Sequence, residues 1–255
     1  MLETSVLVGT PSDDVPEILA TGRTDITTVF VSMAGRHPEG RDADYIEWHC
    51  LDHRPEMHRL TSVRATLRLV STPACRAARA ASEDPFAAVD HVMTYLFALA
   101  DLEGLQGFTT LNFAMIDAGR TPYLLPVVQR GIYSFNGMVA APRIKIGADV
   151  LPWWPARGAY VLVEQGEAAA TDLTEVPGVA GAWWATGIPM DPPYGSGAGN
   201  AGLQITYCYL DTDPVEAAKG LRPVLEKRWA GTRVVPLLAA PFHTIVPYEW
   251  DRHLP

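Results

Sequence analysis

Two histidines stand out as chemically capable residues, because they lie four positions apart in segment 44–57, DYIEWHCLDHRPEM. On a helix, His49 and His53 would share one face. A partly buried imidazole with a pKa near neutral could take a proton from an acidic C–H or O–H, with Asp52 orienting it. His53 is therefore a candidate general base. The alternative is structural: His53 would bond the backbone where Pro55 breaks the helix, and His49 would lie at a solvent edge.

The same spacing suits metal ligands, but a catalytic metal needs a third protein ligand. Glu56, His91 or His243 would have to converge on the pair to supply it. The run HCLDH is similar to the H-x-x-E-H arrangement of some zinc proteases, yet Asp replaces Glu and no distal ligand is evident. We therefore expect no metal site.

A second candidate group lies in the apolar stretch 89–98. His91 and Tyr95 are an even number of residues apart, so a strand would point both to one face. If that face is a barrel interior, the pair could polarise or orient substrate oxygens. If it is the helix-facing side, His91 is a strand-end histidine and Tyr95 is part of the core. Tyr207 in 203–210 and His243 near the C-terminus are further candidates for substrate contacts.

The elements that must position these residues repeat one order, β-α-β-β-α-β. Residue types and breakers predict the following elements: strands at 26–33, 62–70, 89–98 and 132–140 with helices near 44–54 and 102–121, then strands at 159–164, 179–186, 203–210 and 234–246 with helices near 168–175 and 213–229. Short matches, Thr94-Tyr95 with Thr206-Tyr207 and Ala140-Ala141-Pro142 with Ala239-Ala240-Pro241, favour a duplication.

Each such unit forms a four-stranded antiparallel sheet with both helices on one face, so its other face must be covered. Two units packed sheet to sheet would close a barrel with helices outside. We predict an α+β fold made of two tandem ferredoxin-like βαββαβ units, packed as a pseudo-dimeric α+β barrel. The boundaries would be an N-terminal extension at 1–23, a first unit at 24–151, a linker at 152–158 and a second unit at 159–255.

Segment 44–57, set between two strands, resembles the first helix of the dimeric α+β-barrel superfamily, and more narrowly of its EthD-like branch. There an aromatic-rich stretch ends in His-x-Pro, matched here by His53, Arg54 and Pro55. The tryptophan that usually stands four residues before this histidine is replaced by His49, and Trp48 lies one position earlier. The resemblance implies a superfamily with cofactor-independent monooxygenases, polyketide cyclases, lactone isomerases, heme enzymes and proteins without known reaction.

Composition excludes several partners. Hydrophobic residues make up 48% of the 255 residues, charged residues 19%, and the net charge is -9. A chain without clusters of basic residues is expected to bind nucleic acid and anionic membranes poorly. No apolar run is long enough to span a bilayer. Three widely spaced cysteines, without a C-x-x-C pair and without a secretory signal, favour a reduced, cytoplasmic protein.

Run 191–202, which contains DPPYGSGAGN, has no phosphate-binding motif because the Gly-Lys-Ser/Thr ending is missing and no helix follows. It is either a hairpin loop or a lid over a pocket, with Tyr194 as the contact. The tryptophans at 153, 154, 183 and 184 could wall a pocket or seal the seam between the halves, and we favour the seam.

The functional hypothesis is a small hydrophobic, aromatic or polyketide-like molecule bound in the barrel or in a cleft beside the first helix. The chemistry would be cofactor-free acid–base catalysis of monooxygenase, cyclase or isomerase type. His53 would be the base, His91 and Tyr95 would act on substrate oxygens, and Trp48, His49, Tyr207 and His243 would contact substrate. The alternatives are a non-catalytic binding protein with a filled barrel and a heme-binding protein. Exposed sheet edges could pair two copies as a homodimer.

Overall fold

The computed structural model describes residues 6–166, 170–197 and 199–255. In the first half of the chain, the strands are β1 (Thr28–Ala34), β2 (Val63–Val70), β4 (His91–Phe97) and β5 (Val127–Ala140). The helices of this half are α2 (Asp42–Trp48), α3 (Arg54–Met57), α4 (Pro73–Ala77) and α5 (Leu105–Asp117), and a short β3 (Ala81–Ser82) follows α4. Segment α4–β3 was not among the predicted elements.

In the second half, the strands are β6 (Gly158–Gln165), β7 (Val179–Ile188), β8 (Ser196–Gly197), β9 (Leu203–Leu210) and β10 (Val235–Thr244). One long helix, α6 (Pro214–Trp229), begins at an Asp213 cap whose carboxylate accepts two backbone N–H bonds. A 3-10 turn, Thr171–Glu175, occupies part of the predicted helix at 168–175. Residues 168 and 169 of that prediction lie outside the described residues.

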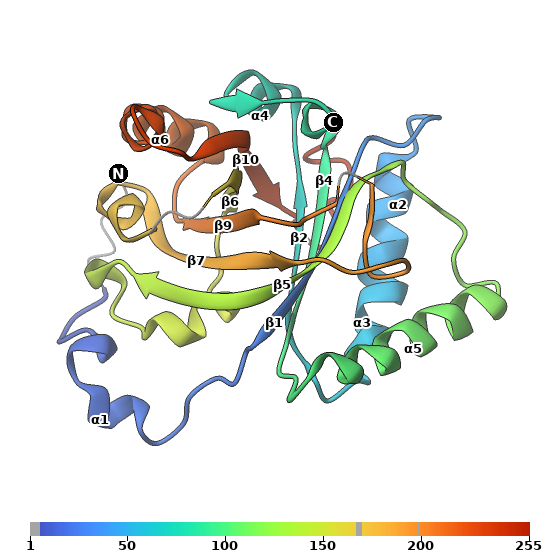
Figure 1. The fold of residues 1–255 in the computed structure, drawn as a ribbon, viewed down its shortest axis with the longest axis horizontal. Coiled ribbons are helices and arrows are strands. Elements are labelled where there is room, and N and C mark those ends of the chain that lie inside the picture. The colour runs from blue at the N-terminus through green and yellow to red at the C-terminus, as the bar shows by residue number, and fades with distance from the viewer. Residues whose placement is uncertain (1–5, 167–169, 198) are drawn as a thin grey trace.

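The strands form one antiparallel system that closes on itself. In the first half the order is β5-β1-β4-β2, and in the second it is β10-β6-β9-β7. Strand β5 pairs with β7, and β10 pairs with β2 through His243↔Val70 and Thr244↔Leu69. The result is a ring of eight strands, an α+β barrel. Figure 1 shows α2, α3 and α5 at the right of the strands and α6 at the upper left. All of these helices lie outside the barrel.

Side chains of the strands fill the inside of the barrel. Trp183 stacks on Tyr207 with ring centroids 4.3 Å apart. The Tyr207 hydroxyl lies 2.7 Å from Thr94 Oγ1, and Trp183 Nε1 donates to the Tyr209 hydroxyl at 3.1 Å. These residues and their aliphatic neighbours are buried in one cluster. A ligand therefore has little room here, which favours the other predicted place, the cleft beside the first helix.

The short internal matches do not correspond in space, which corrects the argument drawn from them. Thr94 and Tyr207 meet inside the barrel, whereas Tyr95 packs outside it against Phe108 of α5, at a centroid distance of 5.0 Å. Thr94-Tyr95 and Thr206-Tyr207 thus place their tyrosines on opposite faces of the sheet. What the two halves share is the strand order.

The first helix is longer than predicted. It begins at Asp42 instead of Asp44, and at His53-Arg54, where Pro55 was expected to end or kink it, it continues to Met57. The reason is a π turn at His49–His53 directly before Pro55. Proline lacks an N–H and its ring crowds the carbonyl four residues earlier, so a locally widened turn lets the helix continue past it.

The N-terminal extension packs on the region between the halves. It contains α1 (Pro16–Leu19). Backbone N–H of Ser12 donates to the Lys145 carbonyl at 3.0 Å, and the Asp13 carboxylate accepts from the Ala148 N–H at 3.1 Å. A 3-10 helix, Ala148–Trp153, reaches into the predicted linker at 152–158. Among the described residues no helix combines the length and apolarity that a membrane span needs.

Candidate functional site

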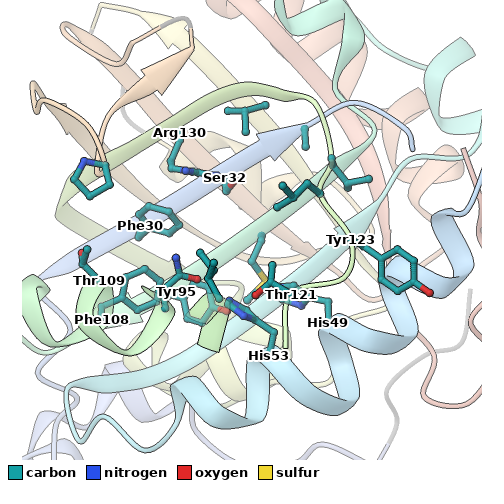
Figure 2. A pocket seen from close by; sticks show the side chains of 18 of the residues that line it. Phe30, Ser32, His49, His53, Tyr95, Phe108, Thr109, Thr121, Tyr123 and Arg130 are labelled. Atoms are coloured by element: carbon teal, nitrogen blue, oxygen red, sulfur yellow. The ribbon is translucent and has the colours of Figure 1, made fainter. Parts of the chain in front are cut away.

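A cleft with a volume of about 440 Å³ lies outside the barrel, between the sheet and the helices of the first half. Its floor is the outer face of β1 and β4, and its walls are α2 with the following π turn on one side and α5 on another (Figure 2). Segment 121–127 and residues Pro193 and Tyr194 complete the lining. Tyr194, the predicted lid contact, therefore lies at this cleft.

The floor is aromatic because strand alternation sends every second side chain toward the helices. Phe30 of β1 and Tyr95 of β4 point outward, and Phe108 of α5 packs on both, at centroid distances of 5.2 and 5.0 Å. All three are buried. Flat aromatic surfaces at offset and edge-on angles suit a planar apolar ligand.

The helical wall carries Trp48, His49 and His53. The ring centroids of His49 and His53 are 5.1 Å apart, and that of Trp48 lies 5.5 Å from His53. The indole N–H of Trp48 donates to the Arg120 carbonyl at 2.9 Å, which fixes this ring at the cleft margin. The π turn thus keeps both imidazoles on the cleft side of the helix, as Figure 2 shows.

Five polar atoms of cleft-lining residues are buried without a hydrogen-bond partner among the described residues: His49 Nδ1, His53 Nδ1, the Tyr95 hydroxyl, Thr121 Oγ1 and Arg130 Nε. Burial lowers the pKa of His53 to about 4, against the opposing charge of Asp52. Burial and then Arg68 hold the pKa of His49 well below its usual value, and burial raises the pKa of Tyr95. At neutral pH the site therefore offers uncharged imidazoles and a phenol that can donate.

His91 lies behind this wall and not on the cleft surface. Its Nε2 is 2.8 Å from Asp42 Oδ1, and its Nδ1 is 2.9 Å from Arg68 Nη2. Since arginine only donates, Nδ1 accepts and the ring proton sits on Nε2, toward Asp42. Burial lowers the pKa of His91 to about 4. Arg68 in turn lies 4.7 Å from the ring centroid of Tyr45, a cleft residue, so this network supports the wall.

The structure brings together four of the seven predicted site residues, Trp48, His49, His53 and Tyr95. It places the other three elsewhere. His91 is behind Tyr45, Tyr207 is inside the barrel, and His243 stacks on His253 at 3.9 Å near the β10–β2 junction. Sequence periodicity could not separate these groups, because β4 and β9 are buried on both faces and both faces are apolar.

Two features of the site were not predicted. Arg130 of β5 lines the cleft. Segment 118–126 crosses the cleft and is tied to the first helix: Arg120 donates to Asp52 at 3.0 Å and to Glu56 at 3.1 Å, and Arg41 donates to the Tyr123 hydroxyl at 2.8 Å. Arg130 lies two residues before the predicted strand at 132–140, so no pattern in the sequence indicated its role. The segment has no regular pattern either.

A metal site is not formed by the described part of the chain, in which no three His, Cys, Asp or Glu side chains are grouped closely enough to hold an ion. Glu56, a ligand that the histidine pair would have needed, is instead paired with Arg59 and Arg120. His49 and His53 thus face the cleft as free imidazoles.

No family model matches this sequence, and a search of curated proteins finds no relative. Solved structures give distant similarities. An anthrone oxidase-like protein has 9% identity and a TM-score of 0.44 over 88% of this chain and 92% of its own. A candidate chlorite dismutase has 10% identity and a TM-score of 0.45, over 86% and 95%. A candidate monooxygenase from Lactobacillus acidophilus has 10% identity and a TM-score of 0.40, over 87% and 94%.

Proposed function

We propose that the cleft binds a small aromatic or polyketide-like molecule and that His53 removes an acidic proton from it without a cofactor. One observation carries this proposal: an uncharged His53, whose buried Nδ1 has no hydrogen-bond partner among the described residues, lines an apolar cleft together with Tyr95, whose hydroxyl is likewise unpartnered. Unsatisfied buried polar atoms are costly, and a ligand that bonds to them is one way in which this cost is removed.

In the proposed step, a proton moves from a substrate C–H or O–H to His53 Nδ1, and the bonding electron pair stays on the substrate as an enolate or phenolate. The Tyr95 hydroxyl, kept protonated by burial, donates to the oxygen on which charge develops. Because the pKa of His53 is low, the substrate proton must be acidic, as between a carbonyl and an aryl ring. Oxygenation, cyclisation and isomerisation can each follow such a step.

The second candidate function is binding without turnover, in the same cleft. The packed barrel interior and the low pKa of His53 favour it, since a weak base transfers few protons. The two candidates predict the same occupant and differ only in whether its acidic proton exchanges.

We also propose that the two halves are ferredoxin-like units in tandem, of the EthD-like branch. Their identical strand order and the mutual pairing of β5 with β7 and β10 with β2 support this. The position of His53 on the first helix, facing the site, is consistent with the branch whose motif it resembles.

Deuterium exchange tests the proton step independently of any later chemistry. 2-Tetralone, a bicyclic ketone with an acidic benzylic C–H, is incubated with the protein in D₂O, and loss of that proton is followed by NMR. We expect catalysed exchange that falls about 100-fold in His53→Gln. A smaller loss is expected in Tyr95→Phe, which removes the donor and keeps the base.

The matched control is His58→Gln, which alters an exposed histidine just after the same helix. It should exchange at the wild-type rate. If wild-type protein binds 2-tetralone but exchanges it no faster than buffer does, binding without turnover is the better description. Equal exchange in wild type and His53→Gln would remove His53 from the role of base.

A further inference from the structure

Arg130 is placed to meet an anion inside the cleft. In the strand register it stands directly opposite Ser32 of β1 on one side and Ser196 of β8 on the other. Residues opposite each other in antiparallel strands share a face, so these three side chains form a row on the outer face of the sheet. Figure 2 shows Arg130 beside Ser32, above Phe30, with His49 and His53 across the cleft.

This guanidinium has no counter-ion among the described residues. Its Nε is buried without a hydrogen-bond partner, and no ion pair with it is formed in the described part of the chain. The carboxylates around the site are already engaged: Asp42 with His91, and Asp52 and Glu56 with Arg120. Burial lowers the pKa of Arg130, and the Tyr45 hydroxyl is the ionisable group that opposes this.

A buried charge without a partner destabilises a folded protein, and an arginine does not escape this cost by losing its proton. The cost is removed when an anion occupies the cleft. The planar guanidinium with its fixed donors matches a carboxylate, which accepts two parallel N–H bonds. The surface beside it is aromatic, since Phe30 lies two residues from Ser32 on the same face of β1.

We propose that the ligand of this cleft is an aromatic carboxylate, whose acid group pairs with Arg130 beside the Ser32 hydroxyl and whose ring lies on Phe30. This inference rests on the proposed function, because it assigns an acid group to the molecule that the cleft is proposed to bind. The pairing with Arg130 orients that molecule. Its carboxylate is held over the paired strands β1 and β5, and the opposite end of its ring system points to His49 and His53.

Calorimetric titration with two probes of equal shape tests the acid group. 2-Naphthoate carries the carboxylate, and 2-naphthamide is its neutral counterpart. We expect wild-type protein to bind 2-naphthoate at least about tenfold more tightly, as a charge-assisted pair would give. Arg130→Gln should bind both probes with the affinity that wild-type protein has for 2-naphthamide. Arg130→Lys should keep part of the preference for 2-naphthoate.

The matched control is Arg64→Gln, since Arg64 is paired with Asp25 on the surface away from the cleft. It should retain the preference for 2-naphthoate. The melting temperature without ligand gives a second readout: Arg130→Gln should melt higher than wild type, since it removes a half-buried charge that has no ion-pair partner among the described residues. A merely structural arginine would give the opposite shift.

The outcomes separate the two proposals. Equal binding of both probes, unchanged by Arg130→Gln, overturns the carboxylate assignment and leaves the cleft as a site for neutral aromatic molecules. Binding of neither probe overturns the carboxylate assignment together with the proposed ligand class. A preference for 2-naphthoate that survives in Arg130→Gln places the acid group elsewhere and also overturns the assignment.

Discussion

At the scale of single residues, the site depends on where each polar atom is left without a partner. His91 is as buried as His49, yet both of its nitrogens are engaged, so it supports the wall. His53 Nδ1 has no such partner and faces the cleft. Residue type alone made these histidines equivalent candidates, and their hydrogen-bond environments separate them.

The protonation state of His53 gives a direct prediction. Burial lowers its pKa to about 4, so its ring should remain neutral from pH 8 down to about pH 5. The imidazole Cε1–H resonance, assigned by its loss in His53→Gln, should therefore keep its neutral chemical shift over that range. A titration near pH 6.5 in the folded protein would mean that water reaches this ring and that the low pKa is wrong.

At the scale of elements, the π turn and segment 118–126 shape the cleft together. The turn keeps His49 and His53 on the cleft side despite Pro55, and the segment is held over the site by Arg120. These tethers are partly exposed ion pairs, and such pairs add little to stability. Their effect should be on how quickly a ligand enters and leaves.

Arg120→Ala tests this. It should raise the dissociation rate of 2-naphthoate several-fold, measured by stopped-flow quenching of tryptophan fluorescence, because the segment loses its ion pairs with Asp52 and Glu56 of the first helix. The unfolding free energy should change by no more than about 1 kcal/mol. Arg252→Ala, which removes an exposed pair with Glu249, serves as the control and should leave the rate unaltered. An unchanged rate in Arg120→Ala would show that the segment does not restrict access.

Elements were easier to predict than the face each residue occupies. Strand 203–210 and helix 214–229 have the predicted ends, because apolar runs and an Asp-Pro start mark them clearly. The first helix was placed too short, since a π turn that accommodates Pro55 leaves no pattern in the sequence. The orientation of His91 and Tyr95 stayed open because β4 is buried on both sides. Arg130 becomes visible as a site residue only when β1 and β5 are in register.

At the scale of the whole molecule, the two halves share a strand order but differ in how their helices pack. The first half leaves a cleft between α5 and the sheet. In the second, α6 closes on β6 and β10 in a buried apolar cluster, and Glu164 is bound there by Arg228 at 2.8 Å and by Trp229 Nε1 at 2.7 Å. The site proposed above therefore lies beside the helices of the first half of the chain.

Buried neutral histidines make the whole fold sensitive to acid. Burial lowers the pKa of the following histidines: His49, His53, His91, His243 and His253. A group with a lower pKa in the folded state binds fewer protons there than in the unfolded chain. Its contribution is complete above the unfolded pKa of about 6.5 and is lost as the pH falls toward 4.

The unfolding free energy, measured with urea, should therefore fall steadily between pH 6.5 and pH 4. His91 alone should account for a loss on the order of 3 kcal/mol, because its pKa is about 4 in the fold. His91→Gln should be less stable at pH 7.5 yet show a shallower decline with acid. A stability that is constant over this range would contradict the burial of these rings in uncharged form.

A crystal structure of the protein with 2-naphthoate tests whether the ligand lies outside the barrel. We expect the naphthalene ring against Phe30 and Phe108, the carboxylate on Arg130, and the far edge of the ring toward His53. Density for the probe inside the barrel beside Tyr207, or an empty cleft at saturating probe, would contradict it.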